Sequence, residues 1–242
     1  MDIALGTALI GAICGPAVAR AAYRLSVPAG EPLRTSCSHC DEELSPSLVA
    51  RVGWAGRCEA CKAAIGPPVW LVALLGLAAG ALVGWRLGND PSVVVFLAFA
   101  LACVLLALVD VAVQRLPDVL TGPLAAVGVV GLSTTSYLAQ DMSPVLRGLI
   151  GAALAGGFFL AIAWVSAPSD GMGLGDAKLA AVLGLFLGWL SWRDLTLGVL
   201  AGTLLAVLYA GVMVLTGRMD RKSPMTYGPF LMVGAALALL LG

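Results

Sequence analysis

The chain has 242 residues, of which 60% are hydrophobic and only 12% are charged. Its mean hydropathy of +0.98 excludes an ordinary soluble domain and indicates an integral membrane protein. The 14 basic and 14 acidic residues give no net charge, so we expect no nucleic-acid partner, and the hydropathy implies the lipid bilayer as a partner.

Eight apolar segments approach the roughly 20 residues that a helix needs to cross a bilayer. They predict an all-α polytopic membrane protein with about eight transmembrane helices. The first is interpreted as a membrane helix and not as a signal peptide, because Asp2 stands where a basic residue is expected. The segments lie at about 3–24, 69–87, 92–110, 119–138, 145–166, 177–192, 195–216 and 226–241.

The distribution of Lys and Arg predicts the orientation in the membrane. With eight spans, both termini lie on one side. If the loop at 25–68 faces the cytoplasm, that side holds 11 of the 14 basic residues, and only Arg86, Arg147 and Arg193 lie on the other. The positive-inside rule therefore places this loop in the cytoplasm and both termini outside.

The loop between the first two spans is polar and holds four of the six cysteines. Cys37 and Cys40 form one CxxC pair, and Cys58 and Cys61 form another after 17 intervening residues. Two such pairs supply the four thiolates of a tetrahedral Zn²⁺ site. Two disulfides are the alternative, which a reducing cytoplasm disfavours. Because a closed Cys₄ site has no position for substrate, the predicted zinc ion is structural.

Two acidic residues lie at the predicted cytoplasmic ends of apolar segments. Asp110 follows 17 consecutive apolar residues, and Asp176 directly precedes the segment at 177–192. A carboxylate at membrane depth is costly and usually serves a function. The simpler interpretations are that Asp110 marks the end of a helix and that Asp176 caps the helix from Ala177 onward.

Three glycines before Asp176 favour a functional site. Gly171, Gly173 and Gly175 remove side chains at alternate positions, so a backbone or a substrate can approach closely. Two carboxyl groups within a few ångströms share one proton, and one can then act as base and the other as acid in peptide hydrolysis. The pair Asp110 and Asp176 would need no metal for this chemistry.

These motifs resemble those of the bacterial prepilin leader peptidases, a family of GxGD-type membrane aspartyl proteases. The sequence DVAVQRLPD at 110–118 is similar to the family's first aspartate motif, and GMGLGDAKL at 171–179 is similar to its glycine-rich second motif. Two more segments, GRCEACKAAI at 56–65 and YGPFLMVGA at 227–235, are similar to further family motifs.

The resemblance implies an endopeptidase of the bacterial inner membrane that removes the short basic leader of type IV prepilin-like precursors, pilins or pseudopilins, at the cytoplasmic face. It implies Asp110 and Asp176 as the catalytic pair. Asp118 is the alternative first acid, although the intervening Pro117 favours Asp110. The glycines would make room for the peptide, and Lys178 would stabilise a carboxylate or a lipid headgroup, or simply lie at the membrane interface.

Many family members also methylate the new N-terminus with S-adenosylmethionine. The segment after Cys61 lacks the Tyr-Pro and the Glu that such members tend to have, so this cofactor is expected only if that activity is present.

The predicted organisation is a membrane helix at 1–24, a cytoplasmic zinc-binding loop at 25–68 and a seven-helix peptidase core at 69–242. A presenilin-type intramembrane protease is one alternative, which the double CxxC and the Leu-Pro-Asp sequence disfavour. A proton-coupled transporter would suit the membrane acids, but no inverted repeat is visible in the sequence. A membrane-anchored zinc scaffold would leave both acids without a role.

Overall fold

The computed structural model describes residues 2–28, 31–43, 57–58, 60–114, 116–165, 173–218 and 226–242. These residues divide into two compact units, Met1–Val113 and Gln114–Gly242. In chain order the described helices are α1 (Asp2–Leu25), α2 (Val69–Leu87), α3 (Val93–Val113), α4 (Asp118–Leu138), α5 (Ser143–Val165), α6 (Leu174–Leu190), α7 (Trp192–Leu215) and α8 (Gly228–Leu241).

The prediction of an all-α polytopic protein is confirmed. Among the described residues, six helices are long and apolar enough to cross a membrane, namely α1 to α5 and α7. The remaining two, α6 and α8, have 17 and 14 residues. Every backbone polar group in a bilayer core needs a partner within the protein, which explains why the apolar segments fold as helices.

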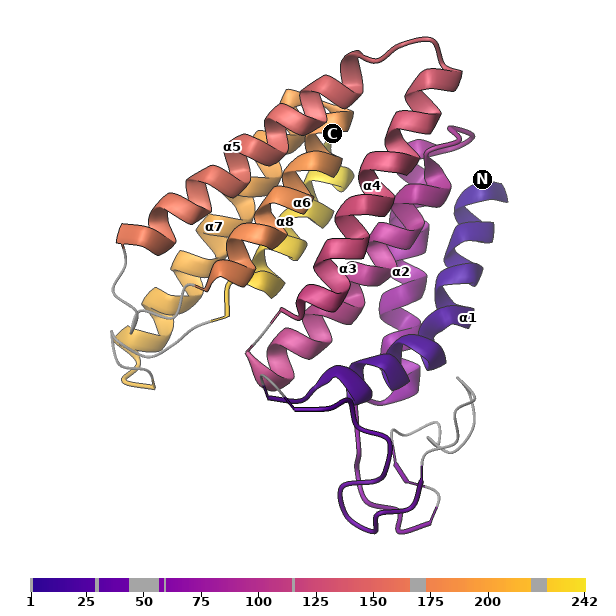
Figure 1. Ribbon diagram of the computed structural model, residues 1–242, viewed down its shortest axis with the longest axis vertical. Helices are drawn as coiled ribbons and strands as arrows, with labels where there is room; N and C mark the ends of the chain where they lie inside the picture. The colour runs from indigo at the N-terminus through magenta and orange to yellow at the C-terminus, as the bar shows by residue number, and fades with distance from the viewer. Residues whose placement is uncertain are drawn as a thin grey trace. The chain divides into compact units, whose positions relative to one another are not determined.

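The first unit consists of α1, α2, α3 and the loop between α1 and α2 (Figure 1). Its tightest helix pair is α1 and α2, which approach each other through small residues. A Cβ atom added at Gly11 would lie 2.0 Å from the carbonyl oxygen of Gly76, and one at Gly80 would lie 2.2 Å from that of Thr7. Such close backbone contact is typical of packing between membrane helices, and larger side chains would separate the pair.

The second unit is built around α6, which contacts α4, α5, α7 and α8 (Figure 1). Glycines again bring backbones together, since a Cβ added at Gly184 would lie 2.4 Å from the carbonyl oxygen of Gly151 in α5. A helix that is apolar on all sides is one that is covered on all sides. Most residues of α6 are buried, as expected for a helix at the centre of this unit.

The C-terminal end of α6 is held by a side chain of α5, and the next helix begins with a side-chain cap. The guanidinium of Arg147 in α5 donates hydrogen bonds to the carbonyls of Gly188, Trp189 and Leu190, which have no partner within the helix itself. Ser191 then caps α7, because its hydroxyl accepts from the Asp194 N–H at 2.9 Å and donates to the Asp194 carboxylate at 2.6 Å. These contacts fix the end of α6 that is opposite to Asp176.

Candidate functional site

The four cysteines of the loop lie together. The sulfur atoms of Cys37 and Cys61 are 3.8 Å apart, as are those of Cys40 and Cys58, and all four lie within 4.8 Å of one another. A tetrahedron with Zn–S bonds of about 2.3 Å has sulfur–sulfur edges of about 3.8 Å. The cluster can therefore hold a metal ion of that size, whereas disulfide sulfurs lie only about 2.05 Å apart.

Each CxxC pair lies in a turn of the same construction. In both turns the N–H of the first cysteine donates to the carbonyl five residues further on, and its own carbonyl accepts from the N–H four residues further on. The residues after the second cysteines, Asp41 and Lys62, have left-handed backbone with φ of 55° and 60°. Backbone N–H groups, foremost that of Cys61, lower the pKa of Cys58 to about 7, which favours the thiolate that binds metal.

Tyr23 connects the cysteine cluster to the membrane helix α1. Its side chain is buried with Ile65 and two of the cysteines. Its hydroxyl donates to the carbonyl of Ser36 at 3.1 Å and accepts from the N–H of Ser38 at 3.2 Å. Tyr23 was not among the residues predicted from the sequence, although a tyrosine at the end of an apolar span is typical of the membrane interface.

Asp110 lies in the last turn of α3, within the first unit. Its side chain is only 3% exposed, and its Oδ2 atom has no hydrogen-bond partner among the described residues. A buried carboxyl oxygen without a partner costs free energy that a residue serving only as a helix end would not incur. The burial therefore favours a functional role for this acid.

Asp176 lies in the first turn of α6, within the second unit. The helix begins at Leu174, so the expectation that Asp176 caps a helix from Ala177 is wrong in register. Gly173 is the N-cap, and the Oδ2 of Asp176 accepts from the Gly173 N–H at 3.2 Å. The helix can begin three residues earlier because an acid at the third helical position reaches back to the N-cap backbone. Asp176 still lies at the positive end of the helix dipole.

The glycines before Asp176 differ in their surroundings. A Cβ at Gly173 would meet its nearest atom at 3.7 Å, an ordinary contact, whereas one at Gly175 would lie 3.2 Å from the Cβ of Leu116. Gly175 thus makes room for Leu116, which comes from the first aspartate motif. Gly171 lies outside the described residues.

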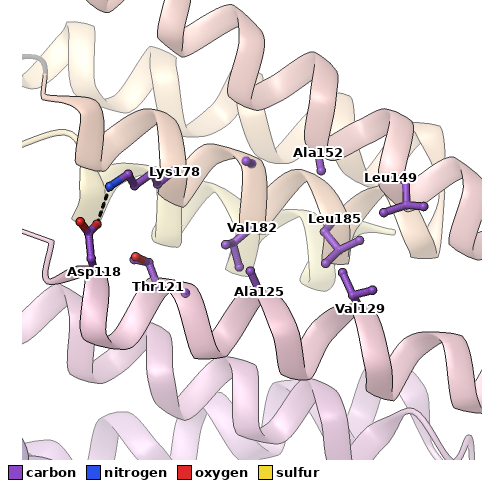
Figure 2. A pocket seen from close by; sticks show the side chains of 11 residues that line it. Asp118, Thr121, Ala125, Val129, Leu149, Ala152, Lys178, Val182 and Leu185 are labelled. Atoms are coloured by element: carbon purple, nitrogen blue, oxygen red, sulfur yellow. Dashed lines mark hydrogen bonds and ion pairs between the residues drawn. The ribbon is translucent and has the colours of Figure 1, made fainter.

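Lys178 and Asp118 form an ion pair in the second unit. The Nζ of Lys178 lies 2.6 Å from the Oδ1 of Asp118, and the side chains are 51% and 71% exposed (Figure 2). Asp118 is the first residue of α4, and Lys178 lies near the start of α6. The pair therefore holds the N-terminal ends of these two helices side by side.

An apolar groove of about 430 Å³ extends from this ion pair between α4, α5 and α6 (Figure 2). Small residues line much of it, including Gly122, Ala125, Ala152 and Ala181. Apart from the ion pair and a threonine, the lining is apolar. The groove can accept an apolar chain that passes close to the backbone of α6.

The fold and these sites define a class of multi-pass membrane protein with acids at helix ends and a cysteine cluster in a polar insert. The type IV leader peptidase family matches residues 94–216, just over half of the chain, and this range includes Asp110 and Asp176. The chain belongs to this family, and it is thus an enzyme of the prepilin peptidase group.

Individual relatives support the assignment over most of the chain. A prepilin leader peptidase/N-methyltransferase of Burkholderia pseudomallei is 33% identical over 244 residues, covering 96% of this chain and 73% of the relative. Proteins of the same name from Pseudomonas aeruginosa and Dickeya chrysanthemi are 29% and 31% identical, covering 94% and 91% of this chain and 76% and 81% of theirs. No solved structure matches the chain.

Proposed function

We propose that this protein removes the short basic leader of type IV prepilin-like precursors at the cytoplasmic face of the bacterial inner membrane, with Asp110 and Asp176 as a catalytic pair. The observation that carries the proposal is the buried carboxyl of Asp110, whose Oδ2 lacks a partner among the described residues. The positive-inside rule supports a cytoplasmic location for the ends of α3 and α6 that carry these acids, because that orientation puts 11 basic residues on the cytoplasmic side.

The two acids would take different roles in hydrolysis. Asp176 accepts a backbone N–H at the positive end of α6, an environment that favours its carboxylate and suits a general base. It would remove a proton from water, whose oxygen attacks the carbonyl carbon of the scissile peptide bond. Asp110, buried among apolar residues, would hold the shared proton and donate it to the carbonyl oxygen. The roles then reverse as the new amino terminus leaves with a proton.

The cysteine cluster would have a structural part in this protein. We infer that Cys37, Cys40, Cys58 and Cys61 hold one Zn²⁺, because the sulfur spacing suits zinc and the predicted cytoplasmic location disfavours disulfides. When bound, the ion would stabilise the polar loop that carries the four cysteines.

The proposal is limited to the peptidase reaction. The relatives' name includes N-methyltransferase. This chain lacks the Tyr-Pro and the Glu expected after Cys61, so S-adenosylmethionine is a cofactor only if methylation is found.

The proposal predicts that Asp110→Asn and Asp176→Asn each abolish cleavage. The purified variants are incubated with a prepilin-like protein that carries a basic leader, and kcat/KM is measured. Loss of a general acid or base lowers the rate by about 10²- to 10⁴-fold. Asp141→Asn is the matched control, because its carboxylate accepts from the Ser143 N–H at the start of α5, which Asn can also do. A fully active Asp110→Asn variant would contradict the assignment of the first acid.

A further inference from the structure

The two aspartate motifs touch each other within the second unit, at points on either side of Asp176. Leu116 is 7% exposed and packs against Gly175, the residue before Asp176. Asp118 forms its ion pair with Lys178, two residues after Asp176. The Leu-Pro-Asp segment therefore contacts the first turn of α6 through one apolar and one ionic contact.

The local backbone presents Asp118 for this contact. Pro117 is the N-cap of α4, with φ of −69° and ψ of 127°, and its ring fixes the first of these angles. Asp118 then occupies the first helical position, where the dipole of α4 favours a negative charge. A fixed anion at the start of α4 thus meets a cation at the start of α6.

We propose that Asp118 and Lys178 are positioning residues, whose ion pair holds the first turn of α6 against the start of α4 and so fixes the carboxyl group of Asp176. The inference rests on the proposed catalytic role of Asp176. In this proposal Asp118 is a fixed charge that positions α6, and it is not the catalytic acid of the first motif. Because both side chains are largely exposed, the pair contributes little to folding stability, and its effect lies in the orientation of the turn.

This role predicts coupling between the two residues. Asp118→Asn and Lys178→Met should each lower kcat by about 2- to 5-fold with little change in KM, the size of effect that an exposed ion pair can supply. The neutral double variant should be no slower than either single variant, since the second substitution removes nothing further. The exchange Asp118→Lys with Lys178→Asp should restore part of kcat, because it re-forms the ion pair while the dipole of α4 still favours an anion at position 118.

The experiment measures kcat and KM of these variants on a prepilin-like substrate, with thermal unfolding as a check of folding. If the two single effects multiply in the double variant, or if Asp118→Asn is as active as wild type, the inference is overturned. Where the exchanged pair does not fold, Asp118→Glu and Lys178→Arg replace it, and each should retain kcat. Failure of the proposed function itself looks different, because Asp176→Asn would then cleave as well as wild type does.

Discussion

Asp110 and Asp176 are held by their helices in different ways. Asp110 lies at the C-terminal end of α3, buried and with one oxygen that has no partner among the described residues. Asp176 lies at the N-terminal end of α6 and accepts a backbone N–H. The two carboxyl groups thus have different environments, as the proposed division of roles between an acid and a base would need.

Gly175 provides a test at the scale of a single residue. A Cβ at this position would lie 3.2 Å from the Cβ of Leu116, so the larger side chain in Gly175→Val must displace Leu116 or the first turn of α6. We expect kcat/KM for leader cleavage to fall by about tenfold or more, an effect of the size that misplacement of a catalytic group causes. Leu116→Ala in the same chain should recover part of the loss.

The control for this substitution is Gly157→Ala in α5, where an added Cβ meets no atom within 4 Å. Its activity should equal that of wild type. If Gly175→Val also cleaves at the wild-type rate, the contact with Leu116 has no bearing on Asp176.

At the scale of helices and turns, the sequence predicted most of what the structure describes. Apolar segments of sufficient length gave eight helices, because a bilayer leaves the backbone few alternatives. The predicted start of α6 at residue 177 was wrong, and the helix begins at Leu174. Its N-cap is Gly173, which has no side chain that could have indicated a cap in the sequence. The ion pair of Asp118 and Lys178 joins residues 60 positions apart, and no local pattern indicates such a contact.

The two CxxC turns give a prediction at this scale. Purified protein should contain one equivalent of zinc, and the fourfold Cys→Ser variant at 37, 40, 58 and 61 should contain none, as metal analysis can measure. The double variant Cys14→Ala and Cys103→Ala, which leaves the cluster intact, should keep its metal. Acid should release the ion, because protons compete with the metal for the cysteine thiolates. Equal zinc in wild type and the fourfold variant would refute the site.

At the scale of the whole molecule, the distribution of Lys and Arg predicts the orientation in the membrane, and with it the side on which the two acids lie. By the positive-inside rule, the distribution of basic residues predicts that the ends carrying Asp110 and Asp176 face the cytoplasm. Within the second unit, the ion pair independently puts the starts of α4 and α6 at one level, as that topology requires. The pairing of Asp110 with Asp176 stays a prediction, because the two acids belong to different units and sequence spacing does not determine whether they meet.

The most direct measurement of joint action by these acids is the pH dependence of kcat/KM, using a substrate with no titratable side chain beside the scissile bond. A pair that shares one proton predicts a bell-shaped profile. Activity falls at low pH because both carboxyl groups are protonated and no base remains, and it falls at higher pH because both are ionised and no acid remains. A profile with a single limb, or one that rises steadily toward alkaline pH, would contradict the shared proton.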